Sequence, residues 1–316
     1  MNDGSHNVVV FAPIISLTVT VESANENGSE VHFHPGGQGF WVARMLRHLG
    51  ERPLLCGPVG GESGGVIRGL LDQWGINLSP VKISGSSPVI VQDRRSGERS
   101  VIAETGMPHL SRHELDDLYG SFLDHALSIS TCVVSGQRDR MLPPDTYRRL
   151  GHDLATAKVT VIADLHGEEL AALLEGGGID MLKVSHDDLL EDGLISEEDP
   201  DGQEVQVMID RFVEGGAANV VVSLAGGGAV AHWEGTRYRV RPPELDPADH
   251  RGAGDSMTAG LAAGSIRGLG VEETLRLACA AGAANVTRHG LGSAAETLIP
   301  GLAERVEIEK SVRDPK

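Results

Sequence analysis

The chain has 316 residues, of which 40% are hydrophobic, enough for one large domain with a well-buried core. Its 45 acidic and 27 basic residues give a net charge of −18, which argues against a sequence-independent grip on nucleic acid or anionic lipid. The 3 cysteines lie far apart, without CxxC spacing or the even number of a disulfide framework. The first apolar run, residues 8–17, is too short to cross a bilayer. We therefore expect a cytoplasmic protein whose partner is a small molecule or another protein, and neither nucleic acid nor a membrane.

Short β-branched runs alternate with helical stretches along the chain. VVVFAPII is followed by QGFWVARMLRHLG, PLLCGPVG and GGVIRGLLDQWG, and the alternation resumes after residue 130 with TCVVSG, VTVIAD, DMLKVS and NVVVSLAG. Strands that are apolar throughout are typical of a parallel sheet covered on both faces. We predict an α/β fold in which residues 1–316 form a single domain around a doubly wound, mostly parallel sheet flanked by helices.

Two stretches break this alternation. Residues 16–35 contain SLTVTVES and EVHFHP, and residues 86–104 alternate like a hairpin around Ser96 and Gly97. We expect these strands to form a small β-sheet lid that stands off the main sheet. Each strand has one apolar face, so the lid is also where we expect a homodimer contact.

The stretch HRGAGDSMTAGLAAG, residues 250–264, predicts a helix with an open N-terminus. Gly252, Ala253 and Gly254 would let an anion reach the unpaired N–H groups at the start of this helix. Asp255 beside them is suited to take a proton from an attacking hydroxyl, a combination that indicates phosphoryl transfer. The same residues could instead form only a capped turn, with an acid favoured by the helix dipole.

This stretch and four others resemble the ribokinase/PfkB family of carbohydrate kinases, most closely the branch of 1-phosphofructokinase and tagatose-6-phosphate kinase. DHRGAGDSMTAGLA is similar to the family's D-T-x-G-A-G-D, and HPGGQGFWVARMLRHLG is similar to its N-terminal glycine motif. Further landmarks follow in family order at VVSGQRDRMLPPDTYRRL, LKVSHDDL and VVVSLAGGGAV. The resemblance covers nearly the whole chain and implies a ribokinase-like fold. It also implies ATP- and Mg²⁺-dependent phosphoryl transfer to a hydroxyl of a sugar or sugar phosphate.

The resemblance implies roles for particular residues. Asp255 would be the catalytic base, beside an anion hole formed by Gly252, Ala253 and Gly254. Nucleotide binding would involve Lys183, Ser185, Ser223, Gly226, Gly228, Gly254, Ala283 and Asn285. Substrate binding would involve Ser16, Gly36, Gly37, Gln38, Trp41 and Arg138.

For some of these residues, a purely structural role remains an alternative to ligand binding. Taken alone, Lys183 could be a solvated lysine, and the glycines after Ser223 could form only a tight hairpin. Close helix packing explains Ala283 and Asn285 almost as well as contact with a nucleotide.

The metal-associated positions depart from the family pattern. Ser185 and Asp188 stand where the family has N-x-x-E, so Asp188 would approach Mg²⁺ with a shorter side chain, through water. Asp249 keeps the acid before the glycine motif, which implies a monovalent cation nearby. Because Arg251 replaces a small residue there, its charge is an alternative to that ion.

The residues expected to bind the acceptor substrate depart further from the family pattern. The family's substrate-contacting residues are replaced at Ser16, Gln38, Trp41 and Ser87. Gln38 and Ser87 remove positive charges that hold the substrate phosphate in this branch, and an unpaired phosphate in a protein of this charge is unfavourable. We hypothesise that fructose 1-phosphate and tagatose 6-phosphate are poor substrates, and that the acceptor is uncharged or directs its phosphate to Arg138 and Arg140. Solvated loop arginines are the alternative for that pair.

A second class of function stays open. The chain could be a family member that binds nucleotide or sugar without turnover and acts as a sensor or scaffold. The unchanged GAGD segment favours a kinase over this alternative.

Overall fold

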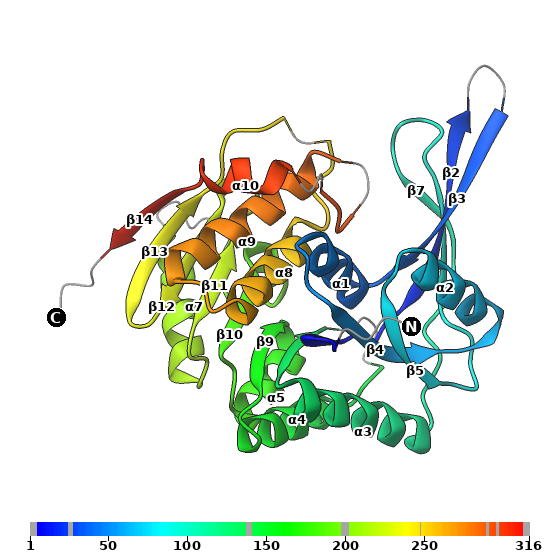
Figure 1. Ribbon diagram of the computed structural model, residues 1–316, viewed down its shortest axis with the longest axis horizontal. Coiled ribbons are helices and arrows are strands. Elements are labelled where there is room, and N and C mark those ends of the chain that lie inside the picture. The colour runs from blue at the N-terminus through cyan, green and yellow to red at the C-terminus, as the bar shows by residue number, and fades with distance from the viewer. Residues whose placement is uncertain are drawn as a thin grey trace.

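The computed structural model describes residues 5–24, 28–136, 141–196, 202–246, 248–288, 291–294 and 297–311. Within these residues, ten strands form one sheet, shown in Figure 1. Its strand order is β14 (Glu307–Ser311), β13 (Thr236–Arg241), β12 (Ala229–Trp233), β11 (Val220–Ser223), β10 (Met181–Ser185), β9 (Thr160–Asp164), β8 (Thr131–Ser135), β1 (Val8–Phe11), β4 (Pro53–Val59) and β5 (Asn77–Lys82). The strands from β11 to β5 are parallel, and β12, β13 and β14 extend the sheet antiparallel.

Helices cover both faces of this sheet, because its central strands are apolar on both sides. In β1, Val8 and Val10 pack into one core, and Val9 and Phe11 pack into the other. The first core is closed by α1 (Gln38–His48), α2 (Gly61–Gln73), α8 (Ala253–Ile266), α9 (Val271–Val286) and α10 (Leu298–Ala303). The second is closed by α3 (Arg112–Ile129), α4 (Pro144–Thr156), α5 (Gly167–Gly176), α6 (His186–Glu191) and α7 (Gln203–Glu214). The predicted doubly wound α/β fold is confirmed.

Helix α8 lies inside the molecule, and its run of small residues allows this. Residues 256–264 of α8 are all buried. A side chain at Gly260 would place its Cβ 2.4 Å from the Cα of Ala278 in α9, so the two helices touch through their backbones. This close packing fixes the N-terminus of α8 above the carboxyl edge of the parallel strands.

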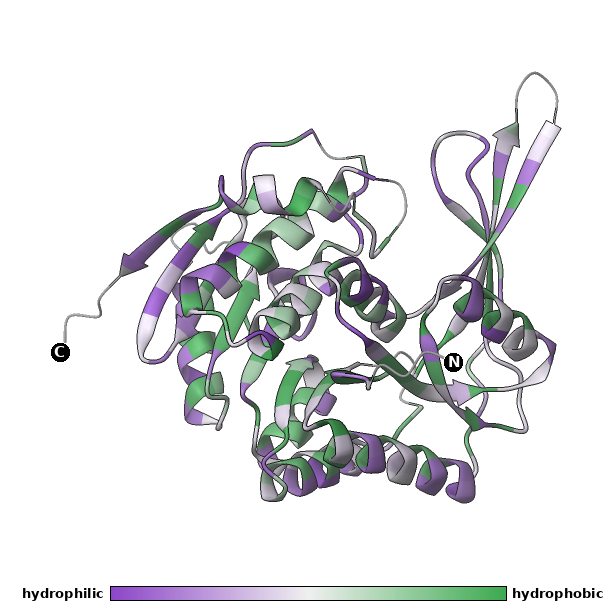
Figure 2. Cartoon of the chain, viewed as in Figure 1, coloured by the Kyte–Doolittle hydropathy of each residue, from purple (hydrophilic) through white to green (hydrophobic). Residues whose placement is uncertain are grey.

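A second sheet of four strands stands to the side of the main one in Figure 1. Its order is β3 (Gly28–Gly36), β2 (Ser16–Ala24), β6 (Val89–Asp93) and β7 (Ser100–Glu104). Figure 2 shows hydrophobic residues on these strands between hydrophilic ones. The predicted small sheet is therefore present, and its use as a lid stays a prediction.

The chain passes from β3 into α1 through a turn that requires glycine. Gly37 has a φ of 108°, and a Cβ there would lie 2.3 Å from the carbonyl oxygen of Ile14. This turn places the start of α1 directly after the end of β3, an edge strand of the second sheet. Among the described residues, no helix has both the length and the apolar content needed to cross a membrane.

Candidate active site

A pocket of about 1790 Å³ lies between the carboxyl edge of the main sheet, the start of α8 and the second sheet. It is lined by most of the residues that the sequence singles out: Ser16, Gly36, Gly37, Gln38, Trp41, Lys183, Ser185, Asp188, Ser223, Gly226, Gly228, Gly252, Ala253, Gly254, Asp255 and Ala283. Ligands of open α/β sheets bind at this edge. Arg138 and Arg140 lie outside the described residues.

The start of α8 faces the pocket with its backbone exposed. Gly252 is the N-cap residue and has a φ of 74°, a left-handed conformation that suits glycine. No side chain in the described part of the chain caps this helix start. The N–H groups of Ala253, Gly254 and Asp255 therefore remain available to an anion.

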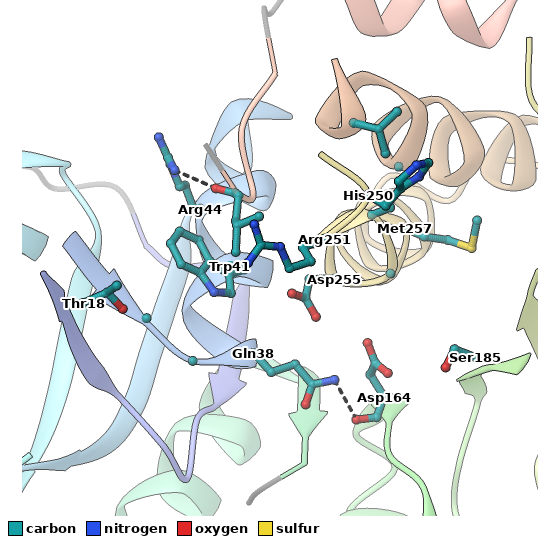
Figure 3. A pocket seen from close by; sticks show the side chains of 18 of the residues that line it. Thr18, Gln38, Trp41, Arg44, Asp164, Ser185, His250, Arg251, Asp255 and Met257 are labelled. Carbon is teal, nitrogen blue, oxygen red and sulfur yellow. Dashed lines mark hydrogen bonds between the residues drawn. The ribbon is translucent and has the colours of Figure 1, made fainter. Parts of the chain in front are cut away.

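Asp255 shares the pocket floor with a second carboxylate that the sequence analysis missed. Asp164 ends β9 and is only 3% exposed, and Figure 3 shows both carboxyl groups pointing into the pocket. Burial and the negative charge of Asp164 raise the pKa of Asp255 to about 7, against the opposing effect of Lys183. Asp255 therefore exchanges its proton near neutral pH.

Lys183 is held beside this pair. Its Nζ lies 3.2 Å from Asp164 Oδ1, and the Thr258 hydroxyl donates to Asp164 Oδ2 at 2.6 Å. Burial lowers the pKa of Lys183, but the surrounding aspartates outweigh burial, so its pKa is raised and it stays charged. Lys183 is 4% exposed, so the alternative of a solvated lysine is wrong.

The Lys183 ammonium also lies against the start of α8. A Cβ on Gly254 would come within 2.8 Å of Lys183 Nζ. A buried cation and a set of free N–H groups therefore meet at one point. This pairing is suited to a phosphate group.

Ser185 and Asp188 form a capping box at the start of α6. The Ser185 N–H donates to Asp188 Oδ2 at 2.8 Å, and the Asp188 N–H donates to Ser185 Oγ at 3.0 Å. The spacing of this motif is thus explained by helix capping, while Asp188 Oδ1 takes no part in the cap. Because Mg²⁺ bound with ATP needs only one or two carboxylates beside the phosphates, Asp188 still fits such an ion. Among the described residues, no three His, Cys, Asp or Glu side chains are grouped to hold a metal by themselves.

One part of the pocket, called the slot below, is lined by the glycine turn after β11 and by residues of α9. Gly228 has a φ of 84°, and a Cβ there would lie 2.1 Å from the Val240 carbonyl oxygen. The lining residues on α9 are small or apolar, among them Gly282, Ala283 and Val286. A flat, largely apolar ring such as a nucleobase suits this slot.

Asn285 does not line the slot, contrary to the sequence prediction. It is fully buried, and its Nδ2 donates to the Arg251 carbonyl oxygen at 2.6 Å. Its side chain therefore supports the segment that leads into α8.

Gln38, predicted to touch the substrate, holds two strand ends together. The Gly136 N–H donates to Gln38 Oε1 at 2.8 Å, and Gln38 Nε2 donates to the Asp164 carbonyl oxygen at 3.3 Å (Figure 3). Both polar atoms of its amide are thus engaged by backbone. Trp41, on the same helix, is 8% exposed and packs edge-on against Phe40, with ring centroids 4.6 Å apart.

A group of arginines lines the end of the pocket that lies under the second sheet: Arg44, Arg94, Arg99 and Arg251. Burial lowers the pKa of Arg99 to about 10, and the positive charges of Arg251 and Arg94 add to this effect. Burial and the same kind of neighbours lower the pKa of His34 to about 4, so this histidine is neutral. The pocket therefore contains positive charges other than the two whose loss was inferred at Gln38 and Ser87.

These arginines differ in their partners. Arg94 lies 3.3 Å from Glu22, and Arg44 donates to the Leu291 carbonyl oxygen at 2.6 Å. Arg99 is only 17% exposed and lies 3.9 Å from Asp249. Its Nε is buried and has no hydrogen-bond partner among the described residues. Arg99 is thus the arginine with the most unused hydrogen-bonding capacity.

Known proteins are similar to this chain over most of its length. A model of the pfkB family of carbohydrate kinases matches residues 5–298. The chain is 28% identical over 309 residues to 1-phosphofructokinase of Bacillus subtilis (strain 168), covering 96% of this chain and 98% of the relative. The fold is similar to crystal structures of a putative phosphofructokinase from Staphylococcus aureus (TM-score 0.82, 21% identity, covering 96% and 99% of the two chains) and of phosphofructokinase-2 from Escherichia coli in complex with potassium (TM-score 0.82, 24% identity, covering 95% and 98%).

The chain belongs to the pfkB family of carbohydrate kinases. It is an ATP-dependent sugar kinase that resembles 1-phosphofructokinase, as the sequence motifs predict. Nothing in these comparisons favours the alternative of a sensor without turnover.

The raised pKa of Asp255 predicts how stability depends on pH. Its pKa is about 7 in the folded protein, against an ordinary value of 3.8. The folded state therefore binds this proton more tightly than the unfolded state does, and stability is lost as pH rises from the lower value towards the higher one. The variant Asp255→Asn lacks this loss, so its Tm should exceed that of the wild type at about pH 8, and the difference should shrink towards about pH 4. A Tm difference that does not change with pH would contradict the raised pKa.

Proposed function

We propose that this kinase transfers the γ-phosphoryl group of ATP to a hydroxyl of a sugar that already carries a phosphate. Fructose 1-phosphate is the first candidate, as the name of the Bacillus relative suggests. The observation that carries the proposal is a single pocket that joins the partly buried carboxylate of Asp255, at an open helix start, to a wall of arginines. The reaction would take place in the cytoplasm, where the buried free cysteines stay reduced.

Asp255 is the general base in this proposal. With a pKa of about 7, it accepts the acceptor's hydroxyl proton at neutral pH. The acceptor oxygen forms its bond to the γ-phosphorus while the bond from that phosphorus to the bridging oxygen breaks, and ADP leaves. The N–H groups at the start of α8 and the ammonium of Lys183 stabilise the charge on the transferred group.

The nucleotide occupies the slot beside α9 in this proposal. Its base lies against Ala283 and Gly282, and its phosphates extend past Ser223 and Gly228 towards Lys183. Mg²⁺ would be held by the phosphates and Asp188, and would neutralise phosphate charge when bound.

The acceptor phosphate is directed to Arg99 and its arginine neighbours. Burial lowers the pKa of Arg99, and the positive charges of Arg251 and Arg94 add to this effect, so a bound phosphate would stabilise its charged form. The same charges replace those that Gln38 and Ser87 do not provide.

The second sheet acts as a lid over the acceptor and as a dimer contact in this proposal. Its outer strands expose large apolar side chains, with Phe33 51%, Val101 53% and Ile102 59% exposed. Exposed apolar groups concentrated on one sheet are typical of a surface that another subunit covers.

Turnover of Asp255→Asn tests the assignment of the base. The amide keeps the shape of the side chain but cannot accept the proton, so kcat should fall by about 10² to 10⁴. The Kd for ATP, measured by calorimetry, should change little. Asp116→Asn, at an exposed acid on α3, is the control and should behave as the wild type. Turnover near that of the wild type would rule Asp255 out as the base.

Arg99→Met tests the site for the acceptor phosphate. The KM for fructose 1-phosphate should rise about tenfold or more, while the KM for ATP stays the same. Arg95→Met is the matched control, because Arg95 lies on the same hairpin but is paired with Asp93 outside the pocket. Wild-type enzyme that prefers unphosphorylated fructose, or an Arg99→Met variant that keeps the wild-type KM, would contradict this assignment.

Sedimentation tests the dimer contact. Wild-type protein should sediment as a dimer at micromolar concentration, and Ile102→Lys should sediment as a monomer because it buries a charge in the contact. Val207→Lys changes a residue that is 51% exposed on α7 and should remain dimeric. A monomeric wild type would overturn the contact.

A further inference from the structure

Asp249 and Arg251 form a charged clip in the segment just before α8. The Arg251 N–H donates to Asp249 Oδ1 at 3.1 Å, its Nε donates to the same oxygen at 3.0 Å, and its Nη2 donates to Oδ2 at 2.7 Å. Arg251 thus donates hydrogen bonds to both oxygens of the Asp249 carboxylate, from its backbone N–H and from its guanidinium group. A fork of this kind is among the strongest polar contacts in proteins.

The clip controls the backbone that leads into the open helix start. The N–H groups of Ala248 and Asp249 both donate to the Val286 carbonyl oxygen, at 2.7 and 3.2 Å. On the other side of the clip, the Arg251 carbonyl accepts from Asn285 at 2.6 Å, and Gly252 follows in the left-handed conformation. The position of the anion-binding N–H groups therefore depends on this segment.

The Asp249 carboxylate needs a positive partner. Its side chain is 9% exposed. Burial raises the pKa of Asp249, but the hydrogen bonds from Arg251 and the charges of Arg251 and Arg99 outweigh burial, so its pKa is lowered and it stays ionised. A buried carboxylate without a cation would be strongly unfavourable.

A monovalent cation does not fit this carboxylate as it stands. The phosphofructokinase-2 structure from Escherichia coli is a complex with potassium, and the family resemblance implies such an ion near Asp249. In this chain an ion bound there would have to displace a guanidinium that already satisfies both oxygens. The Asp249 carboxylate, which would be the side-chain ligand of such an ion, is therefore already paired with Arg251.

We propose that the guanidinium of Arg251 is a tethered replacement for a monovalent cation, so that the enzyme needs no added potassium. The arginine supplies one positive charge at Asp249 and holds the segment before α8 in place. Because it is covalently attached, its effective concentration does not depend on the salt present.

The test compares thermal stability in KCl, NaCl and tetramethylammonium chloride at equal ionic strength, without substrates. Wild-type protein should have the same Tm in all three salts. Arg251→Thr should have a Tm lower by about 2 °C or more in tetramethylammonium chloride, and potassium should restore the loss. Arg251→Lys keeps the charge and should remain insensitive to the choice of salt.

Arg95→Thr is a closely matched control. Arg95 clips Asp93 in the same way, with its N–H and Nε on Oδ1 at 2.9 and 3.0 Å and its Nη2 on Oδ2 at 2.6 Å. This second clip lies on the hairpin between β6 and β7, outside the pocket. Its loss should produce no response specific to potassium.

Turnover provides the second readout. Wild-type turnover should not depend on potassium, whereas Arg251→Thr should lose about tenfold or more in tetramethylammonium chloride and recover in KCl. A potassium-specific rise in the Tm or turnover of the wild type would overturn the proposal. So would an Arg251→Thr variant that does not respond to potassium, since Arg251 would then be only an ordinary ion pair. Failure to phosphorylate any sugar phosphate would count against the proposed acceptor, but the Tm comparison would still decide this inference.

Discussion

The buried pair of Lys183 and Asp164 is the interaction on which the site depends. It joins the end of β9 to the middle of β10, and Asp164 also accepts a hydrogen bond from Thr258, one turn into α8. Two strands and a helix from distant parts of the sequence are thereby held at one point. A buried ion pair is expensive unless its hydrogen bonds are satisfied, and here the hydroxyl of Thr258 supplies one of them. Burial, together with the negative charge of Asp164, raises the pKa of Asp255 to about 7, and Lys183 opposes this rise.

The fold and the local parts of the site could be predicted from the sequence. Strand β1 is apolar on both faces, which predicts a sheet covered on both sides, and the glycines before Asp255 predict an open helix start. The apolar strand and the open helix start can both be inferred from residues that are adjacent in the sequence. The antiparallel strand β14 was not anticipated, because EIEKS at the end of the chain lacks the apolar run that marks the central strands.

Contacts between distant segments could not be predicted in the same way. Asp164 meets Lys183 and Thr258 only after folding, and Arg99, Arg44 and Arg251 line one pocket from three separate segments of the chain. The spacing of Ser185 and Asp188 was interpreted as a metal motif, yet a capping box has the same spacing. A short motif cannot separate these two roles, whereas hydrogen-bond geometry can.

The contrast between a net charge of −18 and a pocket wall of arginines has a consequence for how ligands arrive. At long range the protein repels the phosphorylated molecules that its pocket attracts at contact. Salt screens the distant repulsion over a Debye length of about 10 Å at 0.1 M, but it screens the partly buried Arg44, Arg94 and Arg99 less. The association rate and the affinity of an anionic ligand therefore respond differently to ionic strength. Added salt raises the association rate more than it weakens the binding of the ligand in the pocket.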